Sequence, residues 1–361
     1  MTLESGTPWW SWAAPAGALA LGAAVPALLQ GHVSVALFVV GIPLLFAAVF
    51  AAVHHAETVA HRIGEPFGSI VLALAVTVIE VSLIVSILLQ APDGNSSIAR
   101  DTVFAAIMIA LNGIVGLCLL VGGLMHHEQE FQARSATAGL GVLGTLAVLG
   151  LVLPNYTTTL QGPVYAPAQL GFVAVVSLAL YSLFLYVQTV RHKDAFLDEN
   201  AGDGHHARPD RKTFLIGLAL LPVALLSVVL IAEVLAHPVE EAIIRSGFPE
   251  ALIGVVIAMV VLMPEGLASL RAARSNRLQT SINLALGSAL ASLCLTIPTV
   301  AILSIVQGQT LILGLEAKHV VLLLSSLFLS TLTLANGRTT VLQGGIHLVI
   351  FCAFVTISAI P

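Results

Sequence analysis

Residues 73–85, ALAVTVIEVSLIV, place one carboxylate, Glu80, in the middle of a run that is otherwise almost entirely apolar. The whole chain has the same character, because 58% of its 361 residues are hydrophobic and only 9% are charged. Its mean hydropathy is +1.00. Such a composition predicts an all-α polytopic membrane protein, in which a mid-span carboxylate costs about 2.5–3.5 kcal/mol on insertion scales. Glu80 therefore requires an explanation.

Apolar runs long enough to cross a hydrocarbon core of about 30 Å occur eleven times along the chain. They lie near 13–30, 32–53, 66–90, 101–124, 136–153, 167–190, 213–236, 249–270, 279–306, 312–334 and 340–360. The first run could be mistaken for a signal peptide. The residues before it carry Glu4 and no Lys or Arg, so we predict a membrane span instead.

Lys and Arg gather in alternate loops and predict the orientation. Eleven fall on the side of the N-terminus: Arg62, Arg134, Arg191, Lys193, Arg208, Arg211, Lys212, Arg271, Arg274, Arg277 and Arg338. Three fall on the other side: Arg100, Arg245 and Lys318. Because cytoplasmic loops carry the excess of basic residues, we expect an N-terminus in the cytoplasm and a C-terminus outside the cytoplasmic (inner) membrane.

The long polar segment 191–212, RHKDAFLDENAGDGHHARPDRK, is predicted to be a flexible cytoplasmic linker. It separates a first half, 32–190, from a second half, 213–361, and 1–31 holds an extra N-terminal helix. Each half contains five predicted spans. Five is odd, so two related halves must lie inverted with respect to each other.

The two halves share a pattern. TVIE at 77–80 matches LMPE at 262–265 with an offset of 185 residues, which sets Glu80 on Glu265. The same register sets Glu65 on Glu250, two acids at helix starts where capping is the expected role. Each half thus carries one mid-span carboxylate.

The following spans also match. NGIVGLCL at 112–119 corresponds to SALASLCL at 288–295 with an offset of 176 residues. Asn112 in the first repeat, and Ser288 and Ser292 in the second, offer neutral oxygens, and the two serines share one helical face. These residues are predicted to complete a ligand shell around the carboxylates.

The paired carboxylates predict a chemistry. A hard divalent cation prefers oxygen ligands and compensating charge, which Glu80 and Glu265 supply together. Without a cation the two carboxylates would repel each other and take up protons. Cation and protons would then compete for the same oxygens, as an antiporter requires. Pro264 is predicted to break its helix at the site and to free a main-chain carbonyl.

Four segments carry a more specific resemblance. They are HAETVAHRIGEPFGSIVLALAVTVIEVSLIV, GGLMHHEQEF, VVIAMVVLMPEGLASLRAARSNRLQTSINLALGSALASLCLTIP and ANGRTTVLQGGIHLVIF. The chain resembles the ChaA-type branch of the cation/proton exchangers, in the cation/calcium exchanger superfamily, over nearly all of 32–361. The resemblance implies ten core helices in two inverted halves, an extra N-terminal span, and exchange of cytosolic Ca²⁺, or in some members Na⁺ or K⁺, for external protons.

The resemblance also implies roles for individual residues. The essential acidic ligands fall on Glu80 and Glu265, the main-chain carbonyl ligands on Val76 and Val261, and the polar positions of the partner helices on Asn112, Ser288 and Ser292. One departure is Gly116, which stands where the second repeat has Ser292. The shell is therefore poorer in oxygen in the first repeat, and the preference for Ca²⁺ over Na⁺ or K⁺ stays open.

Other features weigh less. His54, Glu57 and His61 share a helical face, and His126 and His127 lie on the same predicted side. They would suit a transition-metal site or a pH sensor, but we favour ordinary interfacial polarity. Glu233, near the outer end of its span, would suit a group that attracts cations to the external mouth, but we favour a solvated interfacial carboxylate. His347 in the last span is expected to be a packing partner.

The sequence contains no P-loop, no nucleophile elbow, no HExxH pair and no nucleic-acid-binding patch. We therefore expect no enzymatic activity and no cofactor, with the lipid bilayer, cations and protons as the partners. A cation channel with a carboxylate ring, and less plausibly an intramembrane protease, are the competing classes. The oligomeric state stays open, a homo-oligomer included.

Overall fold

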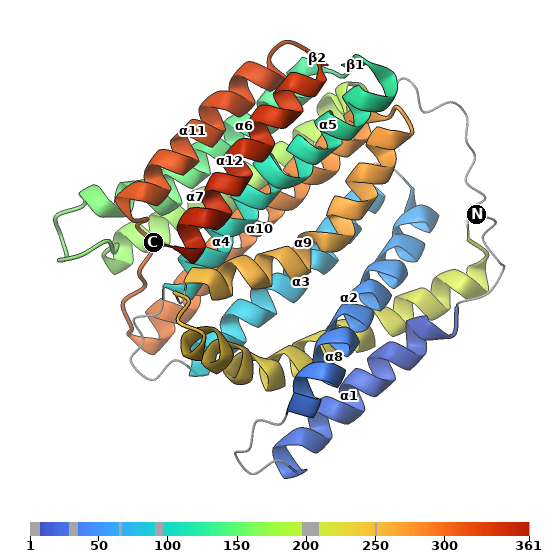
Figure 1. The fold of residues 1–361 in the computed structure, drawn as a ribbon, viewed down its shortest axis with the longest axis vertical. Coiled ribbons are helices and arrows are strands. Elements are labelled where there is room, and N and C mark those ends of the chain that lie inside the picture. The colour runs from blue at the N-terminus through green and yellow to red at the C-terminus, as the bar shows by residue number, and fades with distance from the viewer. Residues whose placement is uncertain are drawn as a thin grey trace. The chain divides into compact units, whose positions relative to one another are not determined.

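The computed structural model describes residues 8–28, 35–64, 67–90, 97–196, 209–249 and 251–360. Apart from two short strands, its elements are helices (Figure 1). The first half contains α1 (Trp10–Leu28), α2 (Val35–Ile63), α3 (Phe67–Gln90), α4 (Ile98–Met108), η1 (Ile109–Ile114), α5 (Val115–His126), β1 (Gln129–Glu130), α6 (Ala133–Ala147), η2 (Val148–Val152), η3 (Leu153–Tyr156), α7 (Pro167–Tyr186), η4 (Val187–Arg191) and η5 (Lys193–Ala195). The second contains α8 (Arg211–Arg245), α9 (Ala251–Arg274), α10 (Leu278–Gln307), α11 (Ala317–Leu334), β2 (Arg338–Thr339) and α12 (Val341–Ala359).

Every predicted span corresponds to a helix or to a run of consecutive helices. Within the described residues, nine helical segments are long and apolar enough to cross a membrane. The two remaining predicted spans are α1 and α3. The all-helical prediction is confirmed, as a bilayer demands, because a helix satisfies its own backbone hydrogen bonds in hydrocarbon.

The predicted helix break at Pro264 is wrong. α9 continues through Pro264 from Ala251 to Arg274. A proline removes one amide donor, so by helix geometry the carbonyl of Val260 loses its partner four residues later. Membrane helices tolerate this loss when neighbouring groups compensate for it, and α2, α8 and α10 likewise contain prolines without ending.

One compact unit comprises 1–87 and 204–247, and so contains α1, α2, α8 and most of α3. The helices α1, α2 and α8 pack against one another. At one end of the α1–α2 contact, His55 Nε2 lies 2.9 Å from the carbonyl oxygen of Ser11. The ring of Trp10 packs beside His54, with centroids 5.3 Å apart.

The second compact unit comprises 88–203 and 248–361. Its central element is α10, which is buried over most of its length and packs against α6, α7 and α9. The strands β1 and β2 pair antiparallel, with Gln129 opposite Thr339, and join the chain segments that follow α5 and α11. The helix α12 runs alongside α5 (Figure 1).

Glycines allow α5 and α12 to approach each other closely. A Cβ atom at Gly116 would lie 2.9 Å from the Cβ of His347. A Cβ at Gly344 would overlap the backbone of Leu120 and lie 2.9 Å from the carbonyl oxygen of Gly116. Small residues are a common means of bringing membrane helices together, because lipid supplies no hydrophobic drive between them.

The substitution Gly344→Ala should therefore destabilise the protein by about 1–3 kcal/mol, because the backbone of Leu120 cannot give way as a flexible side chain would. Gly345→Ala is the matched control, since nothing lies within 4 Å of its added Cβ. Thermal unfolding in detergent measures the difference. Equal midpoints for the two variants would contradict the close crossing.

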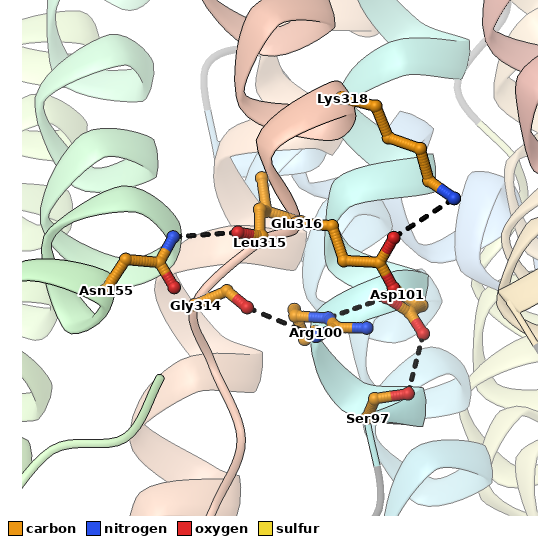
Figure 2. Close-up of polar contacts among 8 residues, drawn as sticks. All are labelled: Ser97, Arg100, Asp101, Asn155, Gly314, Leu315, Glu316 and Lys318. Atoms are coloured by element: carbon orange, nitrogen blue, oxygen red, sulfur yellow. Dashed lines mark hydrogen bonds and ion pairs between the residues drawn. The ribbon is translucent and has the colours of Figure 1, made fainter. Parts of the chain in front are cut away.

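A buried ion pair anchors the start of α4 (Figure 2). Arg100 Nε donates to Asp101 Oδ1 over 2.7 Å, and the two side chains are only 9% and 6% exposed. Ser97 Oγ also donates to Asp101, over 2.8 Å. Arg100 Nη1 donates to the carbonyl oxygen of Gly314 over 3.1 Å, which ties α4 to the segment before α11.

The segment before α11 has further polar contacts (Figure 2). Asn155 Nδ2 donates to the carbonyl oxygen of Leu315 over 2.7 Å. Lys318 Nζ lies 3.0 Å from the Glu316 carboxylate, and this hydrogen bond holds the pKa of Glu316 below its usual value. α4, η3 and the start of α11 are thus connected by polar contacts.

Removing one partner of the buried pair should be costly. Arg100→Met leaves Asp101 charged and buried, so we expect the free energy of unfolding to fall by about 3–5 kcal/mol. Arg338→Met is the matched control, because Arg338 and Glu130 form a pair whose side chains are 61% and 68% exposed, worth about 0–1 kcal/mol. Thermal unfolding of both variants tests this ranking, and a larger loss for Arg338→Met would refute it.

Candidate functional site

Glu80 lies deep within α3. Its side chain is 2% exposed, and the helix continues for ten residues or more on either side of it. One turn earlier, Thr77 is 3% exposed and its Oγ1 donates to the carbonyl oxygen of Ala73 over 2.8 Å. A carboxylate in such a place must be neutralised or paired, since an isolated buried charge is far too costly.

Glu265 occupies the corresponding position in α9 and is 6% exposed. The helix α9 packs against α4, η1, α5 and α10. The next residue, Gly266, lies so near η1 that an added Cβ would be 3.4 Å from Ile114. The turn that carries Glu265 is therefore next to the π-helical segment that carries Asn112.

Asn112 lies within η1, a π-helical segment that interrupts the helix formed by α4 and α5. Single π-helical turns inside α-helices are frequent at functional sites. The side chain of Asn112 is fully buried. Its Nδ2 donates to Ser326 Oγ over 2.8 Å, and its Oδ1 lies 3.1 Å from His347 Nδ1.

Ser288 and Ser292 lie in α10 and are 8% and 1% exposed. Because α10 packs against both α9 and η1, the second unit gathers the helices that carry Glu265, Asn112 and the two serines. That these side chains bind one cation together remains a prediction.

Val76 and Val261, the predicted carbonyl ligands, are 3% and 1% exposed. Both lie in unbroken helix, so their carbonyls face the amides of Glu80 and Glu265 four residues later. A carbonyl oxygen keeps a second lone pair for another partner. Glu80 and Glu265 fall in different compact units, and their predicted meeting at one midplane stays a prediction.

The remaining candidates are less informative. Glu65 and Glu250 lie outside the described residues, and Glu233 is exposed on α8. His126 Nε2 lies 3.0 Å from the carbonyl oxygen of Arg274. In the part of the chain that the structure describes, no group of three His, Cys, Asp or Glu side chains could hold a metal ion, so the transition-metal hypothesis gains no support.

The sequence analysis did not single out a row of buried polar residues on α11. Ser326, Ser330 and Thr333 are at most 5% exposed and follow one another at i, i+4 and i+7. That spacing, which places all three on one helical face, was the available signal. The link that His347 makes between this row and Asn112 was also missed, because the contact is made between distant helices.

Solved structures share this fold. The structure of native YfkE superimposes with a TM-score of 0.76 at 20% identity, covering 97% of this chain and all of that one. The H⁺/Ca²⁺ exchanger CAX gives a TM-score of 0.71 at 15% identity, covering 96% of this chain and 88% of the other. The chain therefore has the same fold as these two solved structures.

Sequence comparison identifies the family. The chain matches the sodium/calcium exchanger protein family over residues 33–190 and 216–360, and it belongs to that family. A protein of Sinorhizobium fredii, provisionally described as an ionic transporter, is 50% identical over 98% of this chain and 97% of its own length. The sodium-potassium/proton antiporter ChaA of Escherichia coli is 35% identical over 86% of this chain and 85% of its own length.

Proposed function

We propose that this protein is a secondary active antiporter that exports cytosolic Ca²⁺ in exchange for external protons. The observation that carries the proposal is the pair of buried carboxylates, Glu80 and Glu265, at equivalent positions of the two repeats. Each is nearly inaccessible in the middle of a long apolar helix. Two carboxylates match the charge of a divalent cation, and their oxygens match its hard character.

The mechanism follows from competition between the cation and protons for the carboxylate oxygens of Glu80 and Glu265. With the site open to the cytoplasm, the ionised Glu80 and Glu265 bind the cation, assisted by oxygens from Asn112, Ser288 and Ser292. With the site open to the outside, protons displace the cation and neutralise both carboxylates. Exchange is obligatory because an empty, doubly ionised site is too costly to occlude within the membrane.

A second candidate is Na⁺ or K⁺ exchange for protons on the same site. The supporting observation is that the 35% identical relative from Escherichia coli is named a sodium-potassium/proton antiporter. The Ca²⁺/H⁺ antiporter ChaA of Bacillus subtilis is 23% identical. In this chain both activities would use Glu80 and Glu265, and they would differ in how many charges the site must compensate.

The orientation belongs to the same proposal. The excess of Lys and Arg in alternate loops supports an N-terminus in the cytoplasm and a C-terminus outside, in the cytoplasmic membrane. Cation export then runs from the side of the linker 191–212 to the opposite side. The two halves, 32–190 and 213–361, would act as inverted repeats around the site.

Proteoliposomes with an imposed proton gradient and no membrane potential test the function. We expect proton-driven Ca²⁺ uptake for the native chain, and loss of uptake in Glu80→Gln and in Glu265→Gln, because an amide keeps the size of the carboxyl group but carries no charge and does not take up or release a proton. Glu128→Gln, at an exposed carboxylate, is the matched control. Uptake of Na⁺ alone would select the second candidate, and uptake indifferent to the proton gradient would indicate a channel.

Competition between protons and the cation also predicts how the apparent KM for the cation depends on pH. Lowering the pH on the side from which the cation is taken up should raise the apparent KM for the cation by up to about tenfold per pH unit for each competing proton. The maximal rate at saturating cation should change less. Uptake rates measured over a grid of pH and cation concentration provide the test, and a KM independent of pH would contradict a shared site.

A further inference from the structure

A directed chain of hydrogen bonds runs through the second unit from α11 to η1 and on to α12. Ser326 Oγ donates to the carbonyl oxygen of Leu322 over 2.7 Å, so its oxygen is available to accept from Asn112 Nδ2, 2.8 Å away. The Oδ1 atom of Asn112 then faces His347 Nδ1 over 3.1 Å. An amide oxygen can only accept, so Nδ1 of His347 carries the hydrogen.

The contact of the other ring nitrogen agrees with hydrogen on Nδ1 of His347. In a neutral imidazole with hydrogen on Nδ1, Nε2 accepts. Thr333 Oγ1 lies 3.1 Å from Nε2 and can donate to it. The contacts of Thr333, His347, Asn112 and Ser326 are thus all satisfied by one neutral tautomer.

The four side chains in this series of hydrogen bonds are buried away from solvent and lipid. Asn112 and Ser326 are fully buried, His347 is 1% exposed and Thr333 is 5% exposed. The hydrogen-bond partners of the imidazole are the amide of Asn112 and the hydroxyl of Thr333, and neither is a carboxylate or a basic group. His347 therefore acts here as a neutral donor of fixed direction.

The close crossing of α5 and α12 brings His347 within reach of Asn112. Gly116 lies one turn after Asn112, and a side chain there would collide with the Cβ of His347. Gly116 is also the position at which the second repeat has Ser292. The first repeat thus lacks a hydroxyl of its own because α12 passes at that point, and α12 brings the imidazole instead.

We propose that His347 is a positioning residue for the cation site, because its Nδ1–H holds Oδ1 of Asn112 and fixes the orientation of that amide. One lone pair of Oδ1 is used by His347, and the second remains for the cation. Groups that orient a ligand in this way commonly change metal affinity by about 10–100-fold when removed. The inference rests on the proposed function in one respect, namely that Asn112 is a cation ligand.

The test is a double-mutant cycle in proteoliposomes, using Ca²⁺, or Na⁺ if only Na⁺ is exchanged. His347→Leu should raise the apparent KM for the cation by about tenfold or more and change the maximal rate by less than about threefold. His347→Asn, whose amide can present a donor near the place of Nδ1, should restore most of the affinity. In the Asn112→Ala background, His347→Leu should have no further effect on KM.

Thr356→Val is the matched control, because Thr356 is exposed on the same helix and bonds only to its own helix at Cys352. Its KM should equal that of the native chain. Thermal unfolding of every variant identifies a folding defect, and His347→Asn supplies the comparison if His347→Leu does not fold.

Two results would overturn the proposal. Equal effects of His347→Leu with and without Asn112 would show that His347 does not act through Asn112. An unchanged KM in His347→Leu and in His347→Asn would show that the contact is irrelevant to binding. Neither result touches the exchange itself, which stands or falls on Glu80→Gln and Glu265→Gln.

Discussion

Polar side chains in the interior of a membrane protein need partners, and this constraint organises the molecule. Lipid tails are as apolar as leucine, so burying hydrocarbon does little to hold one helix against another. Hydrogen bonds and close van der Waals packing must do so instead. In the second unit Arg100 is bonded to Asp101 and to the carbonyl of Gly314, and Asn112 is bonded to Ser326 and His347. Each contact joins segments that are far apart in the sequence or fixes the start of a helix.

Close packing and polar contacts depend on each other. Gly116 and Gly344 bring the backbones of α5 and α12 together, and only at that separation does the imidazole of His347 reach Asn112. A larger residue at either position would separate the helices and break the contact between Asn112 Oδ1 and His347. Buried polar networks are valuable when every member is satisfied and costly when one member is not. This explains why the glycines of one crossing and the histidine that passes there belong to one structural arrangement.

The same arrangement makes the two repeats unequal. In the second repeat Ser288 and Ser292 lie on one face of the continuous helix α10. In the first repeat the corresponding helix contains the π-helical segment η1 at Asn112, and Gly116 replaces the second hydroxyl. A cation between two such halves would meet different neutral ligands on its two sides, although the carboxylates are equivalent. Differences of this kind, in the number and rigidity of oxygen ligands, are what distinguish sites for different hard cations.

The sequence alone determined the helices and the two mid-span carboxylates. A run of about twenty apolar residues has few alternatives to a helix in hydrocarbon, and a carboxylate within such a run is visible without any structure. Local rules failed at Pro264, where α9 continues because a membrane helix can lose one hydrogen bond without ending. They also gave no sign of η1. Only the tertiary structure decided the partners of Asn112, since Ser326 and His347 follow it by 214 and 235 residues. Hydropathy is a property of consecutive residues, whereas a hydrogen-bond partner is set by the packing of helices that are distant along the chain.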